Sequence, residues 1–170
     1  VSYRYIPVLV FFILLFLIPL RTASAKTWST TENCDMPSAS LQEIKTATRE
    51  ECQTRCLENE KCEGVVYITG WKKCSLKSSV KKQAKLRFIS ADMDAQHAYQ
   101  KGSYKLDYDH SGKDLQRLVL DSADQCGEAC AGRADCSAFT YLEGYRVCWL
   151  KKTGGRPGEK VFSCSVKSAG

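Results

Sequence analysis

Hydrophobic and polar positions follow one another in the same order twice along the chain. Each time a short apolar segment, a glycine and a second apolar segment occur in succession, which is typical of a β-hairpin. The first hairpin is predicted over residues 64–77 with Gly70 at its turn, and the second over residues 138–151 with Gly144 at its turn.

A helix is predicted directly before each hairpin. Thr48-x-x-Glu51 and Ser122-x-x-Gln125 match the capping box, in which a hydroxyl and a carboxyl or amide side chain satisfy the first backbone N–H groups of a helix. The first helix is expected to begin at Thr48 and to end near residue 60. The second should occupy the corresponding positions.

Further strands and two irregular segments complete the pattern. Strands are predicted at 41–44, 86–89 and 160–164. The polar residues 26–33 are expected to form a mobile terminus, and the segment 101–103 is expected to be a short linker. The chain is therefore assigned to the α+β class.

The cysteines show that the two halves are an internal repeat. The spacing Cys52-x3-Cys56-x5-Cys62-x11-Cys74 returns as Cys126-x3-Cys130-x5-Cys136-x11-Cys148, without an insertion or a deletion. We call the constant offset that carries Cys52 onto Cys126 the repeat shift. With this shift, Tyr67 falls on Tyr141 and Phe88 on Phe162. Each copy is expected to be one small domain, with residues 26–100 forming the first and residues 101–170 the second.

The repeated cysteines indicate how each domain is cross-linked. Two cysteines at positions i and i+4 of a helix have nearly parallel Cβ vectors, so they should bond to the sheet and not to each other. Because the end of a helix is closest to the strand that follows it, we prefer the pairings Cys56 with Cys62 and Cys52 with Cys74. The second copy would then contain Cys130 with Cys136 and Cys126 with Cys148.

Two cysteines lie outside the repeated set. Cys34 aligns with Tyr108, and Cys164 aligns with Ser90, so each copy contains half of a possible bridge. Our hypothesis is that Cys34 bonds to Cys164 across the two domains. The alternative is an interchain bridge in a dimer.

Residues 1–25 have the pattern of a secretory signal peptide. Arg4 precedes an apolar run from Val8 to Leu20, and Ala23-Ser24-Ala25 forms a small-x-small cleavage site. The run is shorter than the roughly 20 apolar residues that a membrane-spanning helix needs. We therefore expect a secreted or organelle-stored protein without a membrane span once the signal is removed. The ten cysteines should then be oxidised, and they lack the CxxC spacing that would favour zinc.

Composition and motifs argue against several classes of function. The net charge of +6 falls to +4 when Arg4 and Arg21 leave with the signal, which is too mild to favour nucleic acid as a partner. The histidines, His97 and His110, lie in no metal-binding or catalytic motif, and no nucleotide-binding fingerprint occurs. We expect neither enzymatic activity nor a cofactor or bound metal.

The cysteine spacing, on a helix followed by a cysteine-bearing hairpin, resembles that of the PAN/apple family. In this family, disulfides pin one helix onto a small antiparallel sheet. A signal followed by two such modules is most similar to the galactose-binding microneme lectins of coccidian parasites, of the Sarcocystis type. The resemblance implies binding to terminal galactose or N-acetylgalactosamine on host-cell glycans, storage in micronemes, and a homodimer. The family often adds a bridge between the first and last strands of one module, which is found in neither copy of this sequence.

A galactose site needs an apolar surface for one face of the sugar and fixed polar groups for its hydroxyls. At the repeat shift, the second copy alone gains two lysines and two aromatic residues. Lys105, Tyr108, Trp149 and Lys160 replace Thr31, Cys34, Ser75 and Leu86, in that order. We therefore predict the site in the second domain, with two amine donors, two aromatic platforms and two rim residues. In that order they are Lys105 and Lys160, Tyr141 and Trp149, and Tyr108 and Asp109.

A second class of function fits the same sequence. A PAN module can bind another secreted adhesin or a receptor without any sugar specificity. A lectin should agglutinate erythrocytes and be released by free galactose, whereas a protein-docking module should ignore the sugar. Agglutination needs at least two sites per particle, so a lectin with one site per chain should be a dimer.

Overall fold

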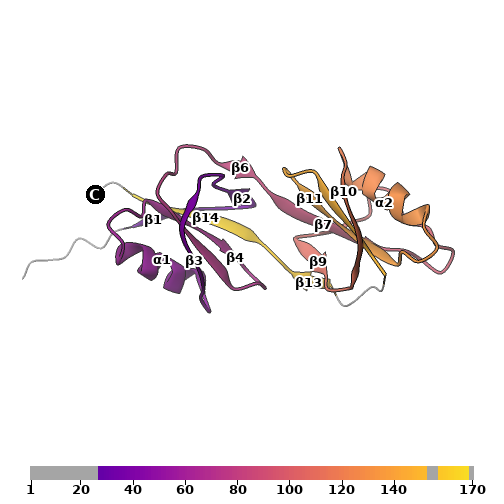
Figure 1. Ribbon diagram of the computed structural model, residues 1–170, viewed down its shortest axis with the longest axis horizontal. Helices are drawn as coiled ribbons and strands as arrows, with labels where there is room; N and C mark the ends of the chain where they lie inside the picture. The colour runs from indigo at the N-terminus through magenta and orange to yellow at the C-terminus, as the bar shows by residue number, and fades with distance from the viewer. Residues whose placement is uncertain (1–26, 153–156, 169–170) are drawn as a thin grey trace, which may run out of the picture.

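The computed structural model describes residues 27–152 and 157–168, and the predicted signal lies outside them. It contains two lobes of the same architecture, each with one helix against one face of a five-stranded antiparallel sheet (Figure 1). The first repeat contains β1 (Trp28–Glu32), β2 (Cys34–Asp35), β3 (Ser40–Lys45), α1 (Arg49–Leu57), β4 (Gly64–Ile68), β5 (Lys73–Lys77), β6 (Ala84–Lys85) and β7 (Arg87–Asp92). The second contains β8 (Lys105–Leu106), β9 (Tyr108–His110), β10 (Asp114–Val119), α2 (Ala123–Ala131), β11 (Ala138–Glu143), β12 (Val147–Lys151), β13 (Pro157–Glu159) and β14 (Phe162–Lys167).

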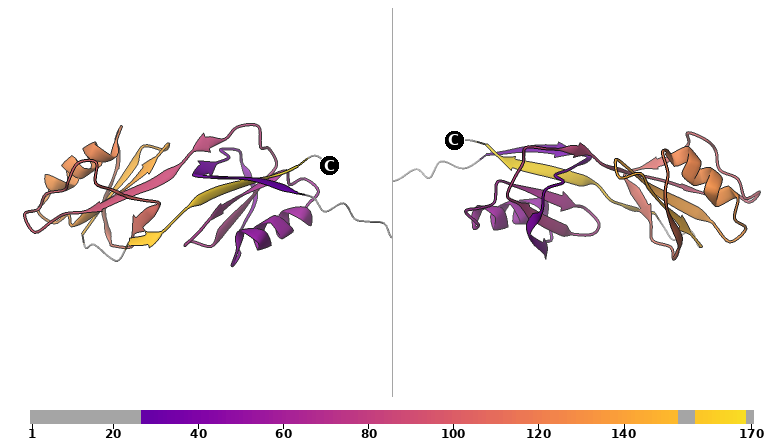
Figure 2. Two further views of the ribbon diagram at one scale, coloured as in Figure 1. Left: turned by 180° about the vertical axis from the view of Figure 1, so that it is seen from behind. Right: turned by 45° about the horizontal axis from the view of Figure 1, so that its top comes forward.

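The two repeats exchange their last strands. Strand β14 from the end of the chain lies between β1 and β4, in the sheet with order β1-β14-β4-β5-β3. Strand β7 from the first repeat lies between β11 and β8, in the sheet with order β10-β12-β11-β7-β8. Both strands cross between the lobes in Figures 1 and 2. We call the lobe with α1 module 1 and the lobe with α2 module 2.

The backbone repeats the same contacts at the two crossing points. Asn33 donates its N–H to the carbonyl of Phe162 (2.7 Å), and Asp107, its counterpart at the repeat shift, donates to the carbonyl of Phe88 (2.8 Å). Both Asn33 and Asp107 adopt a positive φ, a conformation that Asn and Asp tolerate better than most residues. Arg87 forms an ion pair with Asp107 at 3.0 Å. The matching geometry at 33 and 107 relates the modules by an approximate two-fold axis.

Each helix begins with the predicted capping box. In α1 the Glu51 N–H donates to Thr48 Oγ1 (3.1 Å), and in α2 the Gln125 N–H donates to Ser122 Oγ (3.2 Å). In return, the Glu51 carboxylate accepts from the Ala47 N–H. Within the described residues, no helix is long and apolar enough to cross a membrane.

Five disulfides hold the elements together, and all have the predicted pairing. Cys52–Cys74 and Cys126–Cys148 join each helix to the second hairpin strand, whereas Cys56–Cys62 and Cys130–Cys136 close the loop that follows the helix. Cys34 is bonded to Cys164 within the chain. Because β14 belongs to the sheet of module 1, this bridge joins an early strand to the last strand of a single module. The terminal bridge that neither repeat can form by itself is thus present in module 1.

Two other expectations from the sequence need correction. Residues 28–32 form β1, which pairs with β14 from Trp28–Lys167 to Glu32–Ser163, and are therefore part of the sheet. The division into residues 26–100 and 101–170 assigns most elements to their modules, but it places β7 and β14 with the wrong sheets.

Three apolar clusters stabilise the molecule. One cluster lies under each helix and includes its disulfides, around Tyr67 in module 1 and around Tyr141 in module 2. The third lies between the modules, where Phe88 of β7 stacks on Phe162 of β14 with ring centroids 5.3 Å apart. The crossing strands therefore provide the apolar contact between the two lobes.

Candidate ligand-binding cleft between the modules

A cavity of about 450 Å³ opens between the two modules, and we call it the intermodule cleft. Its volume lies in the range of roughly 300–1,000 Å³ that is usual for small-molecule sites. Both repeats contribute to it, and several lining residues correspond to each other at the repeat shift. These pairs are Glu43 with Arg117, Ile68 with Leu142, Trp71 with Tyr145, Lys73 with Val147, and Ser75 with Trp149.

Strand register places these side chains on the faces of the sheets that the helices leave uncovered. Residues directly opposite each other in paired strands point to the same face. In module 1, Ser75 lies opposite both Val66 and Glu43. In module 2, Trp149 lies opposite Arg117. The neighbouring positions 74 and 148 are disulfide cysteines that point to the helices, so the cleft side chains face away from the helices.

Three aromatic side chains line the cleft and remain partly open to solvent. Trp71 is 37% exposed and Tyr145 is 45% exposed, whereas Trp149 is half-buried against the core between the modules. The Trp71 ring meets Phe88 and Phe162 edge-on, at 5.4 and 6.5 Å. These contacts fix the orientation of an aromatic surface at the edge of the cleft.

The wall from module 1 carries fixed polar groups. The Glu43 carboxylate forms an ion pair with Lys73 at 2.9 Å and accepts a hydrogen bond from Ser75. The hydrogen bond from Lys73 is the main reason why the pKa of Glu43 lies below its usual value. Lys77 is buried in this wall and donates to the carbonyl of Ser38 (2.8 Å).

Tyr145 crosses from one module to the other. Its hydroxyl donates to the carboxylate of Asp35, which belongs to the first repeat. Desolvation, together with this hydrogen bond, raises the pKa of Tyr145 to about 12. The phenol therefore stays protonated at physiological pH and ties the two sides of the cleft together.

The wall from module 2 is more apolar. Leu142 and Val147 are buried beneath it, and Trp149 covers them. Arg117, on the edge strand β10, is its exposed charged group. The two walls thus differ in character, because the repeats have diverged at the positions that face the cleft.

The structure separates the six site residues that were predicted from the sequence. Trp149 lines the intermodule cleft. Lys160 lies next to the cleft. The Lys160 amine is 5.2 Å from the centroid of the Trp71 ring and 3.0 Å from Asp109 Oδ2. Tyr108 is 37% exposed on β9, where it pairs with Glu159 of β13. The structure therefore brings Tyr108 and Asp109 of β9 close to Lys160, which directly follows β13.

The other two predicted residues are elsewhere. Lys105 extends from β8 to an ion pair with Asp92 at 3.0 Å and does not line the cleft. Tyr141 is 3% exposed, points to the helix side of its sheet, and donates its hydroxyl to the carbonyl of Leu120. In module 1 the Tyr67 hydroxyl donates to the carbonyl of Thr46, the equivalent position, and to that of Ala47. Tyr141 therefore serves the module interior, as its counterpart does.

Sequence reasoning missed Trp71, Tyr145 and Arg117. The comparison of the two copies searched for groups gained by one copy alone, and the aromatic pair of Trp71 and Tyr145 is common to both. Arg117 replaces Glu43, a change that was visible in the sequence but carries meaning only when both positions face one cleft.

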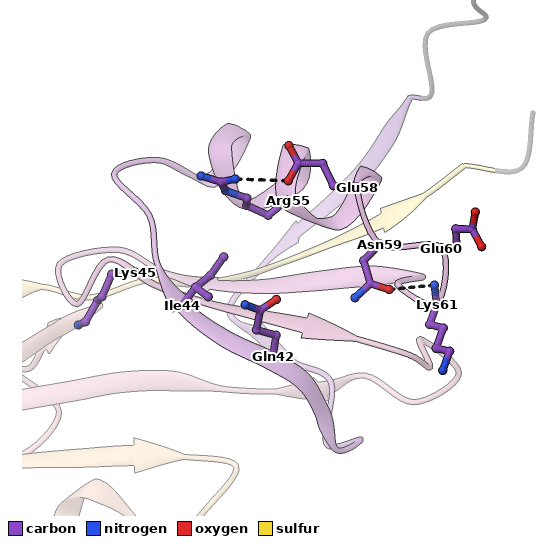
Figure 3. A pocket seen from close by; sticks show the side chains of 8 residues that line it. All are labelled: Gln42, Ile44, Lys45, Arg55, Glu58, Asn59, Glu60 and Lys61. Carbon is purple, nitrogen blue, oxygen red and sulfur yellow. Dashed lines mark hydrogen bonds and ion pairs between the residues drawn. The ribbon is translucent and has the colours of Figure 1, made fainter.

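A larger hollow of about 820 Å³ lies in module 1 alone, between β3 and the end of α1 (Figure 3). Its lining is almost entirely polar. Arg55 is paired with Glu58 (3.3 Å), and the Asn59 amide oxygen accepts from the Lys61 N–H (3.0 Å). The hollow offers no aromatic surface, so we favour the intermodule cleft as the ligand site.

Comparison with protein-family models agrees with the architecture. One model described as a PAN domain matches residues 27–108, and a second model, also described as a PAN domain, matches residues 108–151. A search among curated proteins found no match. PAN domains are protein-binding and carbohydrate-binding modules, and both they and the five disulfides are consistent with a secreted protein. The chain therefore belongs to the PAN/apple family, as two tandem PAN domains that exchange their last strands.

Proposed function

We propose that this protein is a lectin that binds terminal galactose or N-acetylgalactosamine in the intermodule cleft. It would act as an adhesin that is released from a secretory organelle and attaches to host-cell glycans. Binding requires no catalytic group, metal or cofactor. The observation that carries the proposal is a cavity of sugar-binding size in which exposed aromatic rings face oriented polar side chains.

The chemistry of the cleft suits a sugar with one apolar face. The C–H face of galactose can pack on an aromatic ring such as that of Trp149 or Trp71, which loses little side-chain entropy on binding. Its hydroxyls can then reach the wall of module 1, where Glu43 and Ser75 are held by hydrogen bonds. Preorganised groups lower the cost of binding.

Attachment to a cell requires more than one such site per particle. The cleft is formed once in each chain, because it uses one wall from each module. We therefore propose a homodimer as the active form. Two linked sites can raise avidity by about 10²–10⁴ without any change in the individual sites.

Retention on galactose-agarose tests the proposal. Trp149→Ser introduces the residue found at the equivalent position of module 1 and should abolish retention, with folding checked by circular dichroism. Tyr108→Ser is the matched control, since it removes a partly exposed aromatic ring of the second repeat that does not line the cleft. Lys105→Ala should also be retained, whereas Lys160→Ala should weaken retention because it removes the amine beside Trp71.

Each outcome has a definite meaning. If folded Trp149→Ser were retained like the parent protein, the cleft would not be the sugar site. If Tyr108→Ser or Lys105→Ala abolished retention instead, the surface of β8 and β9 would be the site. A dimeric parent protein that is not retained and does not agglutinate erythrocytes would favour docking to another protein.

A further inference from the structure

We infer that the saccharide bound in the intermodule cleft is anionic, and that Arg117 binds its carboxylate or sulfate group. This inference rests on the proposed function and specifies the class of ligand. It starts from the position of a single guanidinium group beside an aromatic ring.

Arg117 and Trp149 are direct neighbours across two strands. Arg117 of β10 lies opposite Trp149 of β12, so both side chains point to the cleft face of the sheet. The Cβ atoms of such a pair are about 4.5–5.5 Å apart. A sugar ring that packs on the indole would therefore carry its substituents within reach of the guanidinium.

Arg117 differs from the other arginines that the structure describes. Each of the others forms an ion pair with a carboxylate: Arg49, Arg55, Arg87, Arg133 and Arg146. Within residues 27–152 and 157–168, no ion pair or hydrogen bond is formed by the Arg117 side chain. Its five donors remain available for a ligand.

The carboxylates that line the cleft already have partners. Glu43 is paired with Lys73, and Asp35 accepts hydrogen bonds from Tyr145 and from the Met36 N–H. Lys77 adds a buried positive charge to the opposite wall. The cleft therefore has an excess of positive charge, which an anionic group of the ligand would neutralise.

Geometry favours an acidic saccharide over other anions. A guanidinium binds carboxylate or sulfate oxygens through two parallel hydrogen bonds, which fixes their orientation. The adjoining indole provides the surface for the sugar ring that carries this group. Module 1 has no equivalent pair, because Ser75 and Glu43 occupy these positions and Glu43 is already neutralised.

Calorimetric titration of the whole mature protein tests the inference with three probes: lactose, lactose 3′-sulfate and 3′-sialyllactose. The parent protein should bind at least one acidic probe roughly ten- to a hundredfold more tightly than lactose, as expected for a charge-assisted contact. The better of the two identifies the acidic group as sulfate or carboxylate. Arg117→Gln should remove this preference, so that the acidic probes bind no more tightly than lactose, whereas Arg146→Gln, outside the cleft in the same module, should keep it.

The outcomes separate this inference from the proposed function. If the parent bound all three probes equally, or if Arg117→Gln kept the preference, the anionic ligand would be refuted and the galactose lectin would stand. If 3′-sulfate or sialic acid were bound equally well without galactose, galactose specificity would fall and the role of Arg117 would stand. Absence of binding by all probes would overturn both.

Discussion

Removal of the Cys34–Cys164 bridge should destabilise the protein more than removal of any other disulfide. The reason is the length of chain that the bridge closes. Cys34 and Cys164 are 130 positions apart, whereas Cys52 and Cys74 are 22 apart and Cys56 and Cys62 only 6 apart. A cross-link between distant residues restricts the unfolded chain more strongly than one between near residues.

The loop-entropy relation gives the expected magnitudes. It predicts a loss in the free energy of unfolding of about 5 kcal/mol for the long loop, about 3.4 kcal/mol for the loop closed by Cys52–Cys74, and about 2.2 kcal/mol for the shortest. Both ends of the long bridge are buried in the cluster between the modules. Replacing both cysteines with alanine avoids leaving unpaired polar groups there.

Urea denaturation, followed by tryptophan fluorescence, measures these differences. Cys34→Ala/Cys164→Ala should lower the midpoint most, and Cys52→Ala/Cys74→Ala is the matched control within the same module. All variants should keep the oligomeric state of the parent protein. A smaller loss for the long bridge than for the control would contradict the reasoning, since loop length would then not determine how much each disulfide stabilises the fold.

Three further results follow from particular contacts. Desolvation and Asp35 raise the pKa of Tyr145 to about 12. The stability that the protonated phenol contributes should therefore be complete below pH 10 and lost between about pH 10 and 12. The ultraviolet absorbance of the phenolate follows this titration, and Tyr145→Phe should remove this pH dependence. Tyr141→Phe should cost about 1 kcal/mol in urea unfolding, through the lost hydrogen bond to the module interior, without changing sugar retention; reduced retention would show that the phenol contacts ligand. Gly144→Ala should cost more than about 1 kcal/mol, because Gly144 has a positive φ and an added Cβ would lie 2.2 Å from the Lys85 carbonyl oxygen; an unchanged melting temperature would contradict this.

Local features of the fold could be predicted from the sequence because they depend on neighbouring residues. The hairpins follow from apolar segments interrupted by Gly70 and Gly144, and the helices follow from capping boxes at Thr48 and Ser122. The disulfide pairings follow from the geometry of cysteines at i and i+4. The hairpins, the helix starts and the four repeated disulfides are each decided within one helix and the hairpin that follows it.

The exchange of strands could not be predicted, because it is not a local property. The segments before β7 and β14 pair with their own repeats, as β6 with β2 and β13 with β9, and the chain then enters the other module. The same strand sequence could pair with either sheet. The choice depends on contacts between distant residues, such as Phe88 with Phe162. The unmatched Cys34 and Cys164 were the one visible sign of it.

The candidate site was predicted only in part for the same reason. Trp149 was correctly recognised as a change between the copies, and it lines the cleft. The other residues that line the cleft, however, come from both repeats, and the strand exchange brings them together. Comparison of the two copies asks which of two equivalent residues belongs to a site. Ser75 and Trp149 both do, because they lie on opposite walls of one cavity.

Separate expression of the two repeats tests the strand exchange most directly. Residues 27–100 and 101–168 are produced as independent chains, alone and together, under oxidising conditions, and are measured by light scattering and circular dichroism. Because each chain lacks the last strand of its own sheet, neither should fold alone, and the two together should form a 1:1 complex joined by the Cys34–Cys164 disulfide. Two independently folded monomers that do not associate would contradict the exchange.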